Sequence, residues 1–68
     1  MSNRLAVLRR SRGWTQDQLA QQLGITRTYL SDLENNKHEA GTWIALKAAH
    51  LMGVPVEKIF RNDEVEHP

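Results

Sequence analysis

One short stretch of the chain, residues 27–35, carries side chains that can donate or accept hydrogen bonds at helical spacing. They are Thr28, Ser31, Asp32 and Asn35 on one outward face, with Arg27 in the first turn and Tyr29 at the margin. Thr, Ser and Asn are mediocre helix formers, so a surface helix without a partner would favour longer charged residues. The chemistry that these residue types support is recognition through hydrogen bonds, on a surface kept for contacts.

Other side chains give no catalytic or metal-binding pattern. The dipeptide His38-Glu39 lacks the second histidine of a zinc-protease motif, and the three histidines have no ligand spacing on one helix. The chain has no glycine-rich phosphate loop after a strand, and a bundle of 68 residues leaves no room for a deep cleft. We therefore expect no enzyme activity, no cofactor, no metal site and no small-molecule substrate.

The helix that carries this polar face is preceded by another with the same start signal. In each copy an apolar residue and a threonine precede a leucine, namely Trp14-Thr15 with Leu19 and Ile25-Thr26 with Leu30. Each threonine can accept the free backbone amides of a first turn, and Gly24 between the copies can adopt the left-handed conformation that ends a helix. The spacing predicts helices over residues 16–23 and 27–34 joined by a tight turn. Many proteins present a helix to the DNA major groove with such a unit.

The remaining apolar pattern predicts three more helices and no strand. The first helix is expected over residues 3–12, the fourth from a cap at Thr42 to Gly53, and a short fifth over residues 56–60. Residues 61–68 are polar and acidic, and we expect a frayed, disordered tail there. The fold class is therefore all-α.

Length and composition limit the chain to one small domain, which we expect over residues 1–60. The chain has no cysteine, so neither disulfides nor a thiolate zinc site can stabilise its core. Its apolar stretches are well short of the ~20 residues that span a bilayer, and its first residues lack a signal-peptide pattern. We expect a cytoplasmic protein that does not enter a membrane.

Charge is divided unevenly along the chain. The formal net charge is only +1, but residues 1–37 carry six Lys or Arg against three Asp or Glu, and residues 38–68 carry three against five. The basic part contains the predicted pair of helices, and such a field steers a polyanion to one side. An asymmetry of this size is also common in proteins that bind no anion.

Two opposite charges occupy matching positions at the edge of the predicted core. Arg9 follows the inward leucines of the first helix, and Glu34 follows those of the third. Each charge alone would be uncompensated at such a position, so we expect the two to form an ion pair. The alternative is that both are solvated.

The fourth predicted helix leaves bulky side chains on its outer side. Its inward arc is filled by other apolar residues, which puts Trp43, Leu46 and His50 together on the outside. Clustered apolar groups on a surface usually mark an interface. We expect a homodimer contact here that also includes Val54 and Phe60 of the following segment. The alternative is that Trp43 folds back over the loop and packs in its own chain.

The run from Asn3 to Phe60 resembles the Cro and phage-repressor helix-turn-helix family, also called the xenobiotic-response-element type. The residues that carry the resemblance are NRLAVLRRSRGWTQDQLAQQLGITRTYLSDLENNK and ALKAAHLMGVPVEKIF. The resemblance implies a compact five-helix bundle of the lambda-repressor type, whose third helix enters the major groove of double-stranded DNA. It also matches Arg9 and Glu34 to an ion pair between helices of the family.

The resemblance further implies which side chains would meet DNA. Base edges would be contacted by Arg27, Thr28, Ser31 and Asp32. Phosphates would be bound by Gln16, Asn35 and Lys37. Gln16 would also brace the start of the third helix. We add Tyr29 to the phosphate set, because it is better placed to pack or to touch phosphate than to read a base.

Two of these roles have alternatives. The Arg27 guanidinium can pair with O6 and N7 of guanine, or it can clamp a phosphate at the start of its helix. The Asp32 carboxylate can accept from N4 of cytosine, or it can be an ordinary exposed acid. The chain departs from the family pattern at Asn36, where glycine is usual, and at Ala40, where proline is frequent. Tyr29 and Asp32 replace residues that are often smaller or neutral in the family, which leaves the operator sequence open.

These observations predict a transcriptional regulator. We expect a repressor that binds a near-palindromic operator as a homodimer. The alternative is a protein-interaction module of the same fold, such as an antitoxin-like protein that neutralises a protein partner, with DNA binding secondary.

Overall fold

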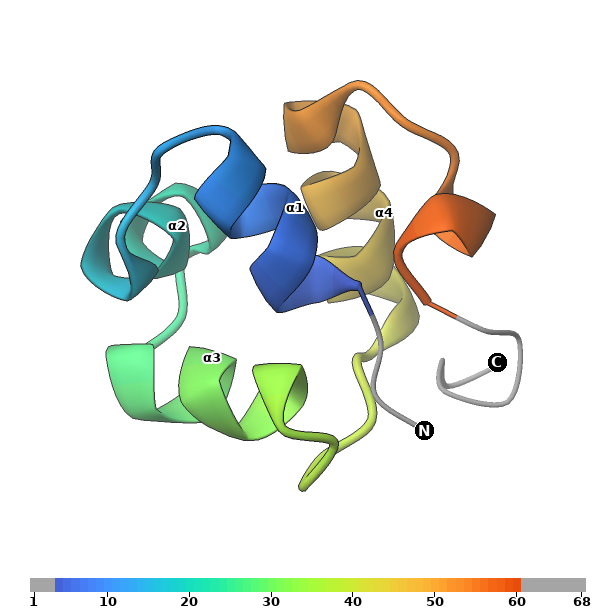
Figure 1. Ribbon diagram of the computed structural model, residues 1–68. Helices are drawn as coiled ribbons and strands as arrows, with labels where there is room; N and C mark the ends of the chain where they lie inside the picture. The colour runs from blue at the N-terminus through green and yellow to red at the C-terminus, as the bar shows by residue number, and fades with distance from the viewer. Residues whose placement is uncertain (1–3, 61–68) are drawn as a thin grey trace.

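Four α-helices and one 3₁₀ turn build the protein, and the computed structural model describes residues 4–60 (Figure 1). The elements are α1 (Leu5–Ser11), α2 (Gln16–Leu23), α3 (Arg27–Glu34), α4 (Thr42–Met52) and the 3₁₀ turn η1 (Val56–Lys58). In Figure 1, α1 crosses the middle of the molecule, α2 lies to its left, α3 lies below it and η1 lies to the right. No helix in the described part of the chain is long and apolar enough to cross a membrane. The all-α class is confirmed, and α2 and α3 span the ranges expected from the sequence.

The core lies where these elements meet. Its largest enclosed side chains are Leu5, Leu19, Leu30, Leu33 and Ile59. Each buried leucine or isoleucine contributes about 1.5–3 kcal/mol relative to exposure. The side of α4 that faces them is built mainly from alanines, which are small enough to let this helix lie close. Because α3 contributes two of the enclosed leucines, its inner side is fixed and its polar side faces outward.

Polar bonds tie the two ends of the described chain together. The backbone N–H of Arg4 donates to the carbonyl oxygen of Ile59 at 2.9 Å. The Arg12 guanidinium, at the end of α1, donates through Nη2 to the carbonyl oxygen of Met52 at the end of α4. These bonds hold α1 against the C-terminal part of the bundle.

The prediction of a fifth α-helix over residues 56–60 is wrong. Only the three-residue 3₁₀ turn η1 forms there, after Pro55. Both residues after it, Ile59 and Phe60, are buried, and the Ile59 carbonyl oxygen is already bonded to Arg4. Because the Ile59 carbonyl oxygen accepts from the Arg4 N–H, it is not available to the N–H of a following helical turn.

The start of α4 also differs from the prediction. Gly41, not Thr42, is the residue before the first turn, and Thr42 is the first helical residue. Gly41 has the extended backbone angles φ −64° and ψ 157°, which any residue can adopt, and glycine is among the residues found at the position before a helix. The end of α4 at Gly53, which has φ 67°, is as expected.

α1 is shorter than the helix expected over residues 3–12. It covers Leu5–Ser11, followed by Arg12 as the cap residue. The next residue, Gly13, has φ 72°, a left-handed conformation that prevents the helix from continuing. The first residue of the predicted helix, and the tail predicted over residues 61–68, lie outside the described part of the chain.

Candidate nucleic-acid interface

α2 begins with a pair of reciprocal hydrogen bonds that fix its first turn. The Thr15 hydroxyl accepts from the backbone N–H of Gln18 at 3.1 Å, and Gln18 Oε1 accepts from the Thr15 N–H at 2.9 Å. These bonds satisfy amides that otherwise lack partners at the start of a helix. Gln16, the first residue of α2, therefore starts from a fixed backbone position.

The turn between α2 and α3 has the geometry that the sequence predicts. Gly24 has φ 73° and ψ 32°, a conformation that strains any residue with a side chain. Two residues later, the Thr26 hydroxyl accepts from the backbone N–H of Tyr29 at 3.0 Å and so caps α3. The two helices thus form a helix-turn-helix unit, with α3 lying along the surface beside α2 (Figure 1).

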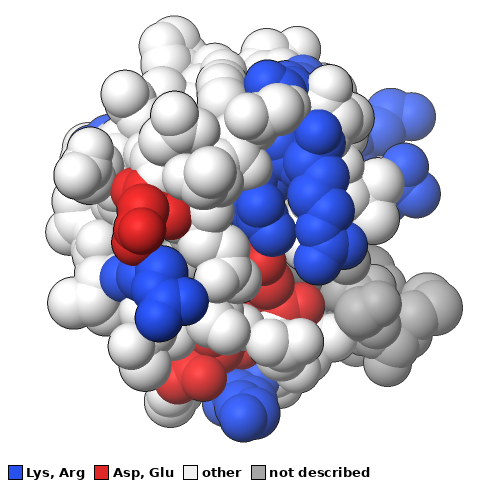
Figure 2. Space-filling model, turned by 60° about the vertical axis from the view of Figure 1, so that its left-hand side comes forward, with Lys and Arg blue, Asp and Glu red and all other residues white. Residues whose placement is uncertain are grey.

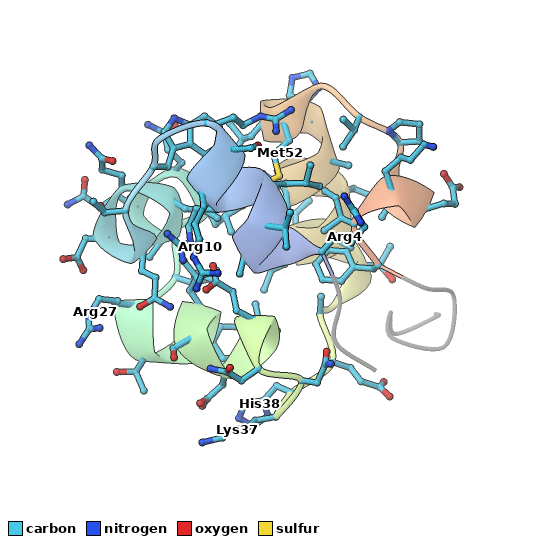
Figure 3. All side chains as sticks on the ribbon, viewed as in Figure 1. Arg4, Arg10, Arg27, Lys37, His38 and Met52 are labelled. Carbon is cyan, nitrogen blue, oxygen red and sulfur yellow. The ribbon has the colours of Figure 1, made fainter. Side chains whose placement is uncertain are left out.

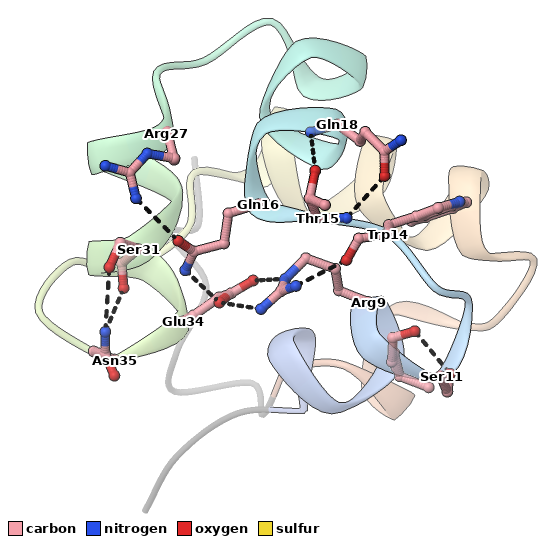
Figure 4. A network of polar contacts seen from close by, with 11 residues as sticks. Arg9, Ser11, Trp14, Thr15, Gln16, Gln18, Arg27, Ser31, Glu34 and Asn35 are labelled. Carbon is pink, nitrogen blue, oxygen red and sulfur yellow. Dashed lines mark hydrogen bonds and ion pairs between the residues drawn. The ribbon is translucent and has the colours of Figure 1, made fainter.

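Arg9 and Glu34 form the ion pair expected from the sequence (Figure 4). Arg9 Nε lies 2.7 Å from Glu34 Oε2, and Nη2 lies 3.2 Å from Oε1, so the contact is two-pronged. The two side chains are only 8% and 4% exposed. Nη1 of Arg9 donates to the carbonyl oxygen of Trp14 at 2.8 Å. A buried charge pair whose hydrogen bonds are satisfied therefore links three elements, which are α1, α3 and the loop that precedes α2.

Gln16 extends this buried network to the surface. Its Nε2 donates to Glu34 Oε1 at 3.0 Å, and its Oε1 accepts from Arg27 Nη1 at 3.5 Å. An amide side chain can both donate and accept, so one residue of α2 connects a buried acid to an exposed arginine (Figure 4). The Gln16 amide, which Glu34 holds from the core, therefore lies within reach of the Arg27 guanidinium.

Arg27 has a second partner on α2. Its Nε lies 3.7 Å from Asp17 Oδ1, and both side chains are more than half exposed. An ion pair this exposed contributes little to stability, but it shows that Asp17 lies within reach of the guanidinium. Figure 3 shows Arg27 at the end of α3 that lies nearest to α2. The guanidinium is open to solvent and can exchange these contacts for a ligand.

The outward side of α3 presents the short polar side chains predicted for DNA contact. Thr28 is exposed, while Ser31 and Asp32 are half-buried. Asn35, the residue that follows α3, donates through Nδ2 to the carbonyl oxygen of Ser31 at 2.9 Å. The surface is therefore a row of hydrogen-bonding groups held close to the helix backbone.

The chain reverses immediately after α3. Asn36 has the left-handed angle φ 60°, and the backbone N–H of Lys37 donates to the carbonyl oxygen of Asp32 at 2.8 Å. Figure 3 shows Lys37 and His38 together below α3. The half-buried Tyr29 contacts the His38 ring, with ring centres 5.7 Å apart. The reversal adds a cation and an imidazole to the polar side of α3.

Charge on this part of the molecule is mixed, with basic groups in excess. On the face shown in Figure 2, Lys and Arg atoms form the largest charged patch, and smaller acidic patches lie beside it. Glu34 is neutralised by Arg9 inside the protein. The acids that remain at the surface of the helix-turn-helix unit are Asp17 and Asp32. At the surface of the helix-turn-helix unit and the reversal after it, Arg27 and Lys37 balance these two acids, so the basic excess comes from arginines in and next to α1.

The outer side of α4 exposes bulky side chains. Trp43 is 71% exposed and Leu46 is 55% exposed. Together with Lys47 and His50 they line a shallow hollow of about 380 Å³, which we call the α4 face. Lys47 Nζ lies 5.8 Å from the centre of a Trp43 ring, within the range of a cation–π contact. Trp43 does not fold back into its own chain.

The prediction that Phe60 belongs to this surface is wrong. Phe60 is 3% exposed and packs in the core, because η1 turns the chain inward at this point. Val54 is half-buried and packs against the core. Of the residues expected at a dimer contact, those open to a second chain are the ones on the α4 face.

Comparison with known proteins agrees with this geometry. The family model described as the helix-turn-helix domain matches residues 2–65. The chain belongs to the helix-turn-helix family. This helix-turn-helix protein is of the Cro and phage-repressor type, as the sequence indicated.

The relatives of this helix-turn-helix protein are similar to it over nearly their full length. An uncharacterized HTH-type transcriptional regulator of Methanocaldococcus jannaschii is 33% identical over 66 residues, which is 97% of this chain and 100% of the relative. Two uncharacterized HTH-type transcriptional regulators of Archaeoglobus fulgidus are 30% and 32% identical over 66 residues, which are 97% of this chain and 94% and 93% of those proteins.

Sequence reasoning did not find two of the contacts at the surface of this helix-turn-helix protein. One joins Arg27 to Asp17, and the other joins Asp32 to His38. The left-handed turn at Asn36 was the signal that could have found the second contact, because a reversal there returns the chain to the helix it has just left.

Proposed function

We propose that this protein is a sequence-specific transcriptional regulator that binds DNA with α3 in the major groove. The observation that carries the proposal is the chain of contacts from the core to the surface, formed by Arg9, Glu34, Gln16 and Arg27. Glu34 holds Gln16 in place before DNA binds, and a contacting group that is held beforehand loses little freedom on binding. The chain of contacts ends where the starts of α2 and α3 meet, the edge that helix-turn-helix units turn toward DNA. The relatives named HTH-type transcriptional regulators support the same function.

We assign base reading to the outward side of α3 and phosphate binding to its surroundings. The base-reading set is Arg27, Thr28, Ser31 and Asp32. The phosphate-binding set is Gln16, Tyr29, Asn35 and Lys37. Phosphate contacts supply affinity that falls steeply with salt, whereas base contacts supply the choice of sequence.

The α4 face is the proposed homodimer contact. Trp43 and Leu46 are neighbouring apolar side chains with most of their surface in water, and clusters of this kind usually mark interfaces. A two-fold dimer would engage two half-sites about one helical turn, ~34 Å, apart. Its operator would be near-palindromic, and a cytoplasmic protein of this size would repress by occluding a promoter.

Selection of bound duplexes from a random pool, at fixed physiological salt, tests the proposal. We expect enrichment of an inverted repeat. Thr28→Ala, an exposed change on α3, should alter the enriched bases without loss of folding. Binding without any enriched sequence, or no binding, would contradict the proposal.

The salt dependence of DNA affinity distinguishes direct phosphate contacts from the effect of the protein's net charge. Lys37→Ala should lower affinity equally on all sequences and reduce the slope of log affinity against log salt by about 1. Lys58→Ala is the matched control, since it removes the same charge from the exposed η1 turn. Equal effects of the two changes would mean that Lys37 contributes only net charge.

Arg27→Ala separates the two roles that remain open for this arginine. A loss confined to the selected operator, of about 1–3 kcal/mol, would identify a base contact. An even loss on all duplexes would identify a phosphate clamp. The guanidinium lies beside Gln16 and Asp17 and is more than half exposed, so it is accessible for either contact.

The α4 face also favours a second candidate, a protein-interaction module such as an antitoxin-like partner of another protein. The mass of the free protein as a function of concentration distinguishes the two. A homodimer predicts a concentration-dependent mass that Trp43→Ala reduces to that of a monomer. A monomer at every concentration, together with no enriched duplex, would favour the protein-interaction module.

A further inference from the structure

We propose that His38 positions the Asp32 carboxylate for base reading and thereby sets the base preference at one position of the operator. The inference rests on the proposed function, because it requires α3 to read DNA. His38 lies outside α3, in the loop that follows it, and the proposed base-reading and phosphate-binding sets do not include it. Its role would be that of a positioning residue that acts through Asp32.

The side chain of His38 lies against two residues on the same side of α3, Asp32 and Tyr29. Its Nε2 lies 3.5 Å from Asp32 Oδ2. Its ring centre lies 5.7 Å from that of Tyr29, with the planes inclined at 47°. Tyr29 and Asp32 are three positions apart on α3 and so neighbour each other on the helix surface. One imidazole therefore contacts both.

The backbone fixes the loop in the position that allows these contacts. Asn36 reverses the chain with φ 60°, and the Lys37 N–H bonds to the carbonyl oxygen of Asp32. His38 is the residue after Lys37. Its side chain therefore begins one position away from the backbone bond between Lys37 and Asp32, and Asp32 is the residue that it contacts. The contact follows from the turn and does not depend on a long flexible side chain.

Asp32 requires such a partner if α3 is to lie against DNA. Its side chain is 29% exposed on a surface that phosphates would approach. A carboxylate that is free to rotate toward the DNA backbone would repel it. Because the His38 ring lies 3.5 Å from Oδ2 and also against Tyr29, it limits the rotation of the carboxylate and favours one direction for Oδ1. A carboxylate oxygen held in this way can accept from the exocyclic amino group of a base, as in contacts with cytosine N4.

Three variants at position 38 separate the contribution of the imidazole N–H group from that of the ring. His38→Gln keeps a donor at a similar reach and lacks the ring, whereas His38→Phe keeps a ring against Tyr29 and lacks the donor. His38→Ala lacks both. The side chain of His38 is 56% exposed, so all three variants should fold, and unfolding midpoints check that they do. Each variant is compared with wild type in affinity for the selected operator and for operators changed at one base pair at a time.

The inference predicts a loss of preference at the single base pair read by Asp32. We expect His38→Ala and His38→Phe to reduce this preference about tenfold, and His38→Gln to retain it. In an Asp32→Asn background, none of the three changes should alter the preference further, because the carboxylate that His38 positions is gone.

Other results overturn the inference. His38 does not position the carboxylate if the base preference is unchanged in His38→Ala. The same conclusion follows if His38→Phe retains the base preference and His38→Gln loses it. An even loss on all duplexes that persists in the Asp32→Asn background would identify His38 as a direct phosphate contact instead. If the wild-type protein selects no sequence at all, the proposed function fails. If the wild-type protein selects an operator and a His38 variant selects it equally well, only the inference about His38 fails.

Discussion

The two sides of α3 each hold one carboxylate, and the two acids are built into the protein in opposite ways. Glu34 is 4% exposed and forms a two-pronged contact with Arg9, with its closest distance at 2.7 Å. Asp32 is 29% exposed and has one side-chain partner among the described residues, the imidazole of His38 at 3.5 Å. Only one residue separates them in the sequence, yet they lie on different sides of the helix.

The difference shows how a short helix combines a fixed side with an adjustable one. Taking the Glu34 charge out of water is costly, so it is stable only with the full set of hydrogen bonds that Arg9 and Gln16 supply. Asp32 is partly exposed and its contact with His38 is longer, so the stability of α3 does not depend on that contact, which can act on the direction of the carboxylate alone. The buried acid fixes where α3 lies, and the exposed acid is free to meet a ligand.

The largest expected effect comes from breaking the fixed side. Glu34→Ala removes the buried acid and leaves the Arg9 guanidinium unpaired in the core, so we expect a loss of about 3–5 kcal/mol in the free energy of unfolding. In a domain of this size such a loss approaches the whole stability. Urea or thermal unfolding followed by circular dichroism measures it.

Asp32→Ala is the control for this comparison. It removes the same group from the same helix, and we expect the free energy of unfolding to change by less than about 1 kcal/mol because the contact is exposed. Similar losses in the two variants would show that the exposed fraction of the acid does not decide its structural role.

The sequence sufficed to predict much of this contrast. Helix-start threonines and the left-handed Gly24 gave the bounds of α2 and α3, because caps and turns depend on neighbouring residues. The pairing of Arg9 with Glu34 followed from the cost of leaving either charge alone at a core margin. Such features are local or are forced by desolvation.

Contacts among exposed side chains could not be predicted in the same way. The pair of Asp17 with Arg27 costs little to make or break, so nothing in the residue types requires it. The replacement of the expected helix over residues 56–60 by the short turn η1 depends on the way the chain returns to α1, which is a property of the whole bundle. Sequence patterns specify the fixed side of α3 better than the side proposed to bind DNA.

A smaller effect is expected from the cap at the start of α3, which both sides share. Thr26→Ala removes the hydroxyl that accepts from the Tyr29 N–H, so we expect a loss of about 0.5–2 kcal/mol in the free energy of unfolding. Thr28→Ala makes the same chemical change two positions later, on an exposed residue within the helix. Its effect should be close to zero or slightly stabilising, because alanine is the better helix former. Equal losses in the two variants would exclude the cap as the cause.

Gln16→Ala cuts the link between the fixed side and the surface. It removes one hydrogen bond to Glu34 and the contact that holds Arg27, so we expect a loss of about 0.5–1.5 kcal/mol in the free energy of unfolding. Affinity for the selected operator should fall by more than this loss of folded protein explains. Gln21→Ala, an exposed change on the same helix, is the matched control. If Gln16→Ala and Gln21→Ala bind the operator equally, the link has no role in recognition.

The smallest effect on stability is expected at Asp17, where a small loss of stability should accompany a gain in DNA affinity. Asp17→Asn removes an exposed partner of Arg27 and an acid that favours the start of α2, so the free energy of unfolding should fall by less than about 1 kcal/mol. Affinity for DNA should rise severalfold at low salt, because the guanidinium no longer has to leave an acid and a charge that repels phosphate is gone. The gain should fade as salt is raised, since exposed charges are screened within about 10 Å at 0.1 M.

Glu57→Gln tests whether this gain is local. It removes the same charge from the exposed η1 turn, so a general effect of net charge would raise affinity equally in both variants. A larger gain for Asp17→Asn would mean that the acid on α2 competes directly with DNA for Arg27. Fluorescence anisotropy of a labelled operator over a series of salt concentrations measures both. A gain in Asp17→Asn that persists at high salt would argue against an electrostatic cause and for a changed position of the α3 start.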